Sequence, residues 1–259
     1  MTRKLEKIIQ SKDIKKPIRQ PELDIHSKVI DFYNTVASVK DHRYKSWENC
    51  HNYFKEIHDN KKQFKELNEQ EQTLAQLQLS FYLASWGMYR GSTFTLQKDY
   101  TICKNLVEEV LKPDYNLLWD IQNNSKDKEE LNNQFKELYN KIHSHLKEVK
   151  KTIKNHKDLT PEKIASFNKE KISDTLITKI ILGTMGCVPA YDRYFMKGLG
   201  IKGFQSKFNQ DKSLINLLDF YQTNKNEIDS ISQKINYTPM KIIDMYFWKI
   251  GYDADSKKE

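Results

Sequence analysis

The stretch Ile172–Gly200, ISDTLITKIILGTMGCVPAYDRYFMKGLG, decides how the rest of the chain is interpreted. It holds four of the eight glycines in this chain of 259 residues, and Gly203 just beyond it is a fifth. The pattern predicts a helix, a break that contains glycine, a proline at position 189 and a second helix that begins at Asp192. Elsewhere glycine and proline are sparse and the chain has the pattern of amphipathic helices. We therefore expect any chemistry to lie in this stretch.

The N-terminal half is predicted to be helical throughout. Apolar residues recur every three or four positions over 22–39, 44–57, 74–89 and 92–111, which is the spacing of amphipathic helices. The helix over 74–89 is apolar on nearly all sides towards its end, so we expect it to be a central buried helix. The helix over 92–111 is expected to stop before Pro113, and residues 59–72 to form a loop or an exposed first turn.

The C-terminal half continues the helical pattern. The clearest helix is predicted over 127–155, another over 214–231, and two Thr-Pro pairs, Thr160-Pro161 and Thr238-Pro239, are typical of helix starts. Because no run alternates with a period of two, we predict an all-α fold of about ten helices in a single globular domain over 22–259, with a possible subdivision near 156–160. The basic residues 1–21 are predicted to form an N-terminal arm.

Composition narrows the class of protein. The net charge of +8 and a pI of about 9.1 favour anionic partners such as nucleic acid. The alternative is that abundant Lys, Asn and Ile reflect an AT-rich genome. Three cysteines without a CxxC pair predict free thiols in a reducing cytoplasm. No run of about 18 apolar residues occurs, so no membrane span is expected.

The segment around Lys179 and Asp192 resembles a known enzyme superfamily. A helix with a lysine, TLITKIIL, is followed by the break GTMGC and then by Val-Pro-Ala-Tyr-Asp, with the aspartate at a helix start. This order is similar to the helix-hairpin-helix DNA glycosylase superfamily, in which a helix of small and apolar residues precedes a proline, a short hydrophobic step and an aspartate. The final helix, with Asp244 and Trp248, also looks like the closing helix of some members.

The resemblance implies an all-helical C-terminal half, a base-excising activity, and DNA rather than RNA as the nucleic acid. Asp192 would match the family's catalytic aspartate, which stabilises the oxocarbenium-like sugar or activates water, and Lys179 is the second candidate catalytic residue. The family's hairpin usually carries Leu-Pro-Gly-Val-Gly, whereas this chain has Glu-Lys-Ile-Ser-Asp at 170–174. The alternative for Asp192 is a plain helix N-cap, and for Lys179 a surface lysine.

A second group of candidate residues surrounds Arg90. This arginine follows an apolar helix, keeps its charge and must pair with a carboxylate or an anion such as phosphate. Trp86 and Tyr89 are expected to stack on a base, and Lys98 with Arg193 completes the predicted nucleic-acid-binding set. The alternative is core packing with an internal ion pair from Arg90 to Asp99 or Asp192.

Other motifs predict little chemistry. The seven histidines have no metal-ligand spacing, so neither a metal nor another cofactor is expected. Gly183-Thr-Met-Gly186 is interpreted as a helix C-cap followed by a turn. Two functions stay open: a nucleic-acid-associated, glycosylase-like protein for base recognition or excision, and a non-enzymatic helical interaction protein.

Overall fold

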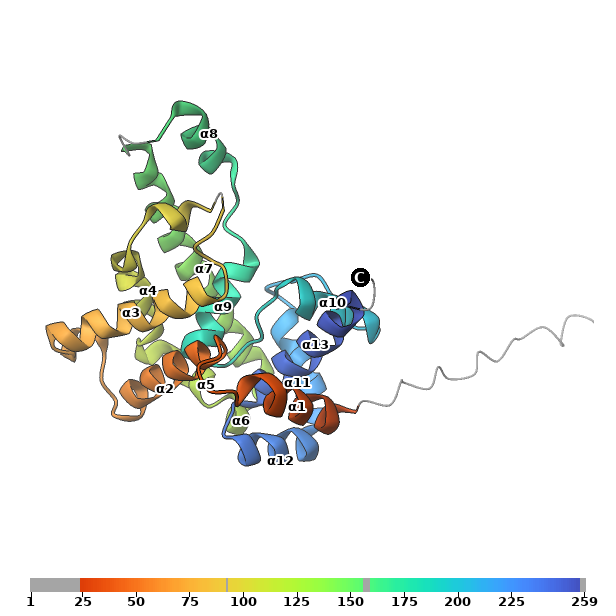
Figure 1. The fold of residues 1–259 in the computed structure, drawn as a ribbon. Coiled ribbons are helices and arrows are strands. Elements are labelled where there is room, and N and C mark those ends of the chain that lie inside the picture. Colours follow the sequence, from red (N-terminus) through yellow and green to blue (C-terminus); the bar gives the residue numbers. More distant parts are fainter. Residues whose placement is uncertain (1–23, 92, 156–158, 257–259) are drawn as a thin grey trace, which may run out of the picture.

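Thirteen α-helices and no strand are found in residues 24–91, 93–155 and 159–256, which are the residues that this computed structural model describes (Figure 1). They are α1 (Ile25–Phe32), α2 (Lys45–Asp59), α3 (Glu69–Ser85), α4 (Lys104–Val110), α5 (Asn116–Trp119), α6 (Ile121–Asn124), α7 (Lys128–Lys151), α8 (Pro161–Lys169), α9 (Asp174–Thr184), α10 (Arg193–Ile201), α11 (Ser213–Thr223), α12 (Lys225–Ile235) and α13 (Pro239–Ser256). The predicted all-α fold is confirmed. The predicted arm over 1–21 lies outside the described residues, as do residues 156–158 at the predicted subdivision.

Several local predictions are confirmed because side chains cap the helices. The hydroxyl of Thr160 accepts a hydrogen bond from the amide of Lys163 at the start of α8. The hydroxyl of Thr238 does the same for the amide of Lys241 at the start of α13. The long helix predicted over 127–155 is α7 followed by a 3₁₀ turn, Thr152–Asn155.

Two predicted helices are divided in the structure. The segment 92–111 contains two 3₁₀ turns, Phe94–Gln97 and Tyr100–Cys103, before α4. The Asp99 carboxylate accepts a hydrogen bond from the amide of Thr101 and caps the second turn. This local hydrogen bond competes with a continuous helix. The segment 214–231 is divided into α11 and α12, with the break at Asn224.

The prediction that 74–89 is buried on nearly all sides is wrong. The helix there, α3, starts earlier than predicted, at Glu69, and ends at Ser85. The side chain of Phe81 is 61% exposed, and those of Leu74 and Leu77 are also exposed. Leu79 and Leu83 on another face are buried. The helix is therefore buried on one side only.

The arrangement of the helices brings the two ends of the described chain together. α1 packs on α12 and α13, so the first described helix lies beside the last ones (Figure 1). α9 contacts α2, α3 and α7 and is buried along most of its length. The buried apolar side chains of the described residues form one continuous cluster that extends from α1 to α13.

α10 and α13 meet backbone to backbone at two glycines. A Cβ atom added to Gly198 would lie 1.9 Å from the carbonyl oxygen of Phe247, and one added to Gly251 would lie 1.9 Å from that of Tyr194. Any larger residue would force the helices apart. This contact fixes α10, and with it Asp192 at its start, against the side chains of α13.

Candidate functional site

Lys179 and Asp192 come together in the structure. α9 carries Lys179 and ends at Thr184, and Gly186 follows with φ of +66°, as predicted for a helix C-cap and turn. A Cβ atom on Gly186 would lie 2.9 Å from both His51 and Thr238, so the turn needs glycine there. The chain then runs to Asp192, whose Oδ2 lies 3.4 Å from the Nζ of Lys179.

Asp192 is also the N-cap of α10. Its Oδ1 accepts hydrogen bonds from the backbone amides of Tyr194 at 3.0 Å and Phe195 at 3.1 Å. The two oxygens therefore differ: Oδ1 is held by the helix start, and Oδ2 lies towards Lys179. The N-cap alternative is correct for Oδ1, and it leaves Oδ2 available for a second role.

Lys179 is buried, so the alternative of a surface lysine is wrong. Its exposed fraction is 4%. A buried ammonium is stable only with a counter-charge, which Asp192 supplies. The Nζ of Lys179 also lies 5.0 Å from the centre of the Trp86 ring, within the range of a cation–π contact.

A second lysine–aspartate pair lies in the same place. On α13 the Nζ of Lys241 lies 2.7 Å from the Oδ2 of Asp244, and both side chains are buried. The Oδ1 of Asp244 accepts the backbone amide of Ala190, two residues before Asp192. The Lys241 ammonium also lies 4.7 Å from the ring centre of Tyr44. Burial lowers the pKa of Lys241, and the neighbouring Asp244 opposes this shift.

Both pairs line one small pocket with aromatic walls. Its lining residues are Tyr44, Tyr82, Trp86, Lys179, Leu182, Ala190, Asp192, Lys241, Asp244 and Trp248. The free space is about 10 Å³, close to the minimum that one water molecule needs. Burial raises the pKa of Tyr44 and of Tyr82 well above 10, so both phenols are neutral at pH 7.

Two polar atoms of the wall lack a hydrogen-bond partner. The Oη of Tyr44 and the Nε1 of Trp86 are buried and make no hydrogen bond to any described residue. An unsatisfied buried polar group costs about 1–3 kcal/mol. The two rings meet edge to face, with their centres 5.5 Å apart. A polar ligand that reached either atom would satisfy it.

The other predicted binding residues lie outside this pocket. Among the described residues Arg90 has no ion pair with Asp99 or Asp192, and its guanidinium lies over Gly87 instead. The Arg193 side chain is 73% exposed and bonds to the hydroxyl of Tyr194. Of the predicted set Trp86, Tyr89, Arg90, Lys98 and Arg193, only Trp86 lines the pocket.

Sequence reasoning missed half of the site. It assigned no role to Tyr44, Tyr82 or Lys241, and it noted Asp244 only through the resemblance. One signal was present: Lys241 and Asp244 are a lysine and an aspartate three positions apart inside an otherwise apolar run, MKIIDMYFW. A charged pair one helical turn apart in such a run indicates a buried ion pair. Tyr44 and Tyr82 carry no such signal.

The cysteines and the possible metal ligands of the described residues do not form a second reactive site. The thiols of Cys50, Cys103 and Cys187 are free and buried, and burial raises the pKa of each one. Within the described ranges, no three His, Cys, Asp or Glu side chains lie close enough to hold a metal ion. In the same part of the chain, every helix is too short or too polar to cross a membrane.

The pocket therefore joins a carboxylate oxygen, two ammonium groups and neutral aromatic rings in a space shielded from water. Such a site favours reactions in which positive charge develops near a carboxylate and a proton is supplied by a neighbouring group.

Comparison of the chain with protein-family models, with curated proteins and with solved structures found no match.

Proposed function

We propose that this chain associates with nucleic acid, DNA rather than RNA, and recognises or excises a base at the pocket of Lys179 and Asp192. The observation that supports this most is that the two side chains, 13 positions apart, meet inside aromatic walls. The net charge of +8 supports an anionic partner. The resemblance to helix-hairpin-helix glycosylases, carried by the same two residues, supports the type of reaction.

In base excision the bond between the sugar carbon and the base nitrogen breaks, and the base leaves with the bonding electrons. The sugar becomes oxocarbenium-like, and the Oδ2 of Asp192 would stabilise that positive charge. The Lys179 ammonium would give a proton to the departing base. Water then adds to the sugar carbon and releases a proton, which restores the ammonium. The reaction is thus a hydrolysis that needs no other reactant.

The proposal requires the pocket to open, because about 10 Å³ does not hold a base. Trp86 is the element of the wall best placed to move. It follows the last residue of α3, it is only partly buried, and Gly87 directly after it has φ of +75°. Displacement of this indole would expose Lys179, and the ring could then stack on a base.

The test compares wild type with Asp192→Asn on DNA that carries modified and unmodified bases. Asparagine keeps the acceptor that caps α10 but removes the charge, so the fold is preserved while the carboxylate is lost. We expect released base from wild type and about a hundredfold less from the variant. Equal release from both proteins would remove the enzymatic proposal. Retention on DNA that does not fall as salt rises would remove the nucleic-acid partner.

A second function is favoured by two specific observations. The Oδ1 of Asp192 is already occupied by two backbone amides, and the pocket is almost closed. A non-enzymatic helical interaction protein accounts for both facts, with the ion pairs serving only to hold α9, α10 and α13 together. Absence of any released base from all DNA substrates would favour this function.

A further inference from the structure

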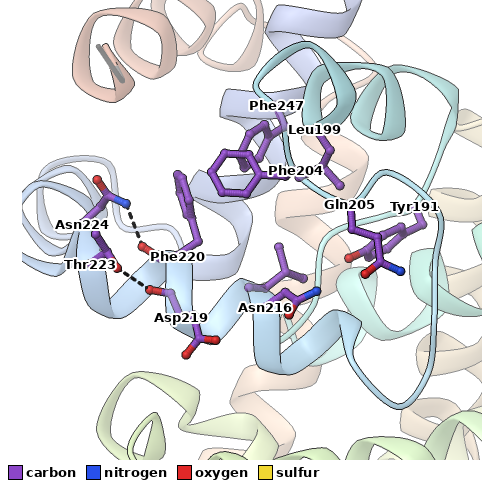
Figure 2. Close-up of a pocket in the computed structure, with 11 residues that line it drawn as sticks. Tyr191, Leu199, Phe204, Gln205, Asn216, Asp219, Phe220, Thr223, Asn224 and Phe247 are labelled. Carbon is purple, nitrogen blue, oxygen red and sulfur yellow. Dashed lines mark hydrogen bonds between the residues drawn. The ribbon is translucent and has the colours of Figure 1, made fainter. Parts of the chain in front are cut away.

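A larger cavity, of about 280 Å³, lies between the end of α10, α11 and α13 (Figure 2). Its lining residues are Tyr191, Leu199, Phe204, Gln205, Asn216, Leu217, Asp219, Phe220, Thr223, Asn224 and Phe247. It shares no lining residue with the pocket of Lys179 and Asp192. Tyr191, which lines this cavity, stands in the sequence between Ala190 and Asp192, which line the other pocket.

The end of α10 builds one wall of this cavity. Gly203 has φ of +80°, its amide donates to the carbonyl of Gly200, and the amide of Phe204 donates to the carbonyl of Leu199. These two bonds are a Schellman motif, which closes a helix and brings the residue after the glycine back onto the last turn. Leu199 and Phe204 therefore lie together on the cavity wall, as Figure 2 shows.

Three phenylalanine rings form the apolar end. The ring centre of Phe204 lies 5.4 Å from that of Phe220 and 5.5 Å from that of Phe247, and both contacts are edge to face. Phe220 and Phe247 are buried, whereas Phe204 is 37% exposed. The exposed part of the Phe204 ring is apolar surface beside the cavity, and a flat ligand would cover it.

The polar side chains of the cavity that have no partner within the described part of the chain are neutral amides. The carboxylate of Asp219 pairs with Lys128, and the side chains of Thr223 and Asn224 donate to backbone carbonyls of α11. The side-chain amides of Gln205 and Asn216 make no hydrogen bond within the described part of the chain, and they lie on the same side of the cavity (Figure 2). They remain available for a ligand.

We propose that this cavity binds a planar, uncharged heteroaromatic ring of about the size of a nucleobase. Phe204, the exposed ring of the three, stacks against one face of this ligand and is supported by Phe220 and Phe247. The amides of Gln205 and Asn216 pair with a donor and an acceptor on its edge. Glutamine and asparagine amides carry both a donor and an acceptor, so they match the mixed edges of such rings.

The charges around the cavity define the ligand further. No lysine or arginine lines it, and its one carboxylate, on Asp219, is already paired. A phosphate inside the cavity would therefore have no counter-charge, so the occupant is the bare ring or the ring of a larger molecule whose charged part stays outside. The inference is independent of the proposed function because it rests on different residues.

The test is calorimetric titration of the full chain with free adenine and free cytosine, with cyclohexanecarboxamide as the non-planar control. We expect saturable binding of at least one base and none of the control. Phe204→Ala is expected to weaken binding about tenfold, since stacking on one ring contributes that much. Asn216→Leu, at an exposed position of α11, is expected to weaken it by a similar factor.

Two further variants separate this inference from the proposed function. Asp192→Asn and Lys179→Met change the other pocket, so the part of the binding that depends on Phe204 and Asn216 should remain in both variants. Loss of binding in those variants, with retention in Phe204→Ala, would place the base in the other pocket and overturn the inference. Equal binding of bases by wild type, Phe204→Ala and Asn216→Leu would also overturn it, and so would no binding by wild type.

Discussion

The two lysine–aspartate pairs of the small pocket have the same chemistry and different surroundings. Lys241 and Asp244 lie one turn apart on α13, 2.7 Å from each other, with side chains 4% and 8% exposed. Lys179 and Asp192 come from different helices, lie 3.4 Å apart, and the side chain of Asp192 is 17% exposed. In both pairs one carboxylate oxygen accepts hydrogen bonds from backbone amides, from Ala190 for Asp244 and from Tyr194 and Phe195 for Asp192. We call Lys241 and Asp244 the sealed pair because their ion pair is shorter and less exposed, and Lys179 and Asp192 the looser pair.

The difference teaches that burial alone does not identify the reactive group. The sealed pair is short and closed to solvent, so its role is to hold the segment before α10 in place. The pair with one oxygen less constrained is the one that can meet a ligand. Three experiments test this division, in order of decreasing expected effect.

The largest effect is expected from Asp244→Ala. This change leaves the buried Lys241 ammonium without a counter-charge and the Ala190 amide without an acceptor. We expect the free energy of unfolding in urea to fall by about 3–5 kcal/mol. The control is the double variant Lys241→Met, Asp244→Ala, which removes both charges and should recover at least half of that loss. A single-variant loss below about 1 kcal/mol would contradict the structural role of the sealed pair.

A loss of stability of about 3 kcal/mol is expected when the pH is lowered, because of the buried His51, which is linked to Lys241 of the sealed pair through Trp47. Its ring stacks on Trp47, which contacts Lys241, and its Nδ1 lies 2.8 Å from the carbonyl oxygen of Thr184. Burial lowers the pKa of His51 from 6.5 to about 4, and the bond to Thr184 opposes the shift. Between these values the unfolded chain binds more protons than the folded one, so stability falls as pH falls from 6.5 to 4.

The measurement is urea unfolding at several pH values between 4 and 7. The control variant is His51→Gln, which keeps a donor for the Thr184 carbonyl but does not titrate. Its stability should change less than that of wild type over this range. If the free energy of unfolding depends on pH in the same way in both proteins, other groups cause the dependence and burial does not lower the pKa of His51.

The smallest effect on stability is expected from Asp192→Asn, about 1 kcal/mol. The amide oxygen still caps α10 through Tyr194 and Phe195, and the ion pair that is lost is longer than that of Lys241 and Asp244 and has a more exposed carboxylate. Asp192→Ala, which also loses the cap, should cost about 1 kcal/mol more in the same urea experiment. If Asp192→Asn destabilises the chain as much as Asp244→Ala, the two pairs are equally sealed and the comparison fails.

The sequence predicts the helices well where local signals set them. Apolar spacing gives α7, and the two Thr-Pro pairs give the starts of α8 and α13, because capping depends only on neighbouring residues. The single helices predicted over 92–111 and 214–231 are each divided in the structure. At the breaks the side chains of Asp99 and Asn224 bond to nearby backbone groups, which the spacing of apolar residues does not record. The face of α3 that carries Phe81 was predicted to be buried because periodicity does not show which elements surround a helix.

The site was predictable only in part. Asp192 and Lys179 were found through a local pattern and a family resemblance, and their meeting depends on the turn at Gly186 between them. Tyr44 and Lys241 come from distant parts of the chain, and their place in the pocket depends on how α2 and α13 pack, which no local pattern records. For Arg90, local context suggested an ion pair that the packing of α3 does not provide.

The glycine contact between α10 and α13 has a consequence for how this region can evolve. Gly198 and Gly251 fit only in one register, and α10 carries Asp192 at one end and the turn to Phe204 at the other. An insertion of one residue in α10 would rotate one end by about 100° against the other and move a side chain into the place of Gly198. The length of this helix is therefore fixed, and loops elsewhere must absorb any insertions.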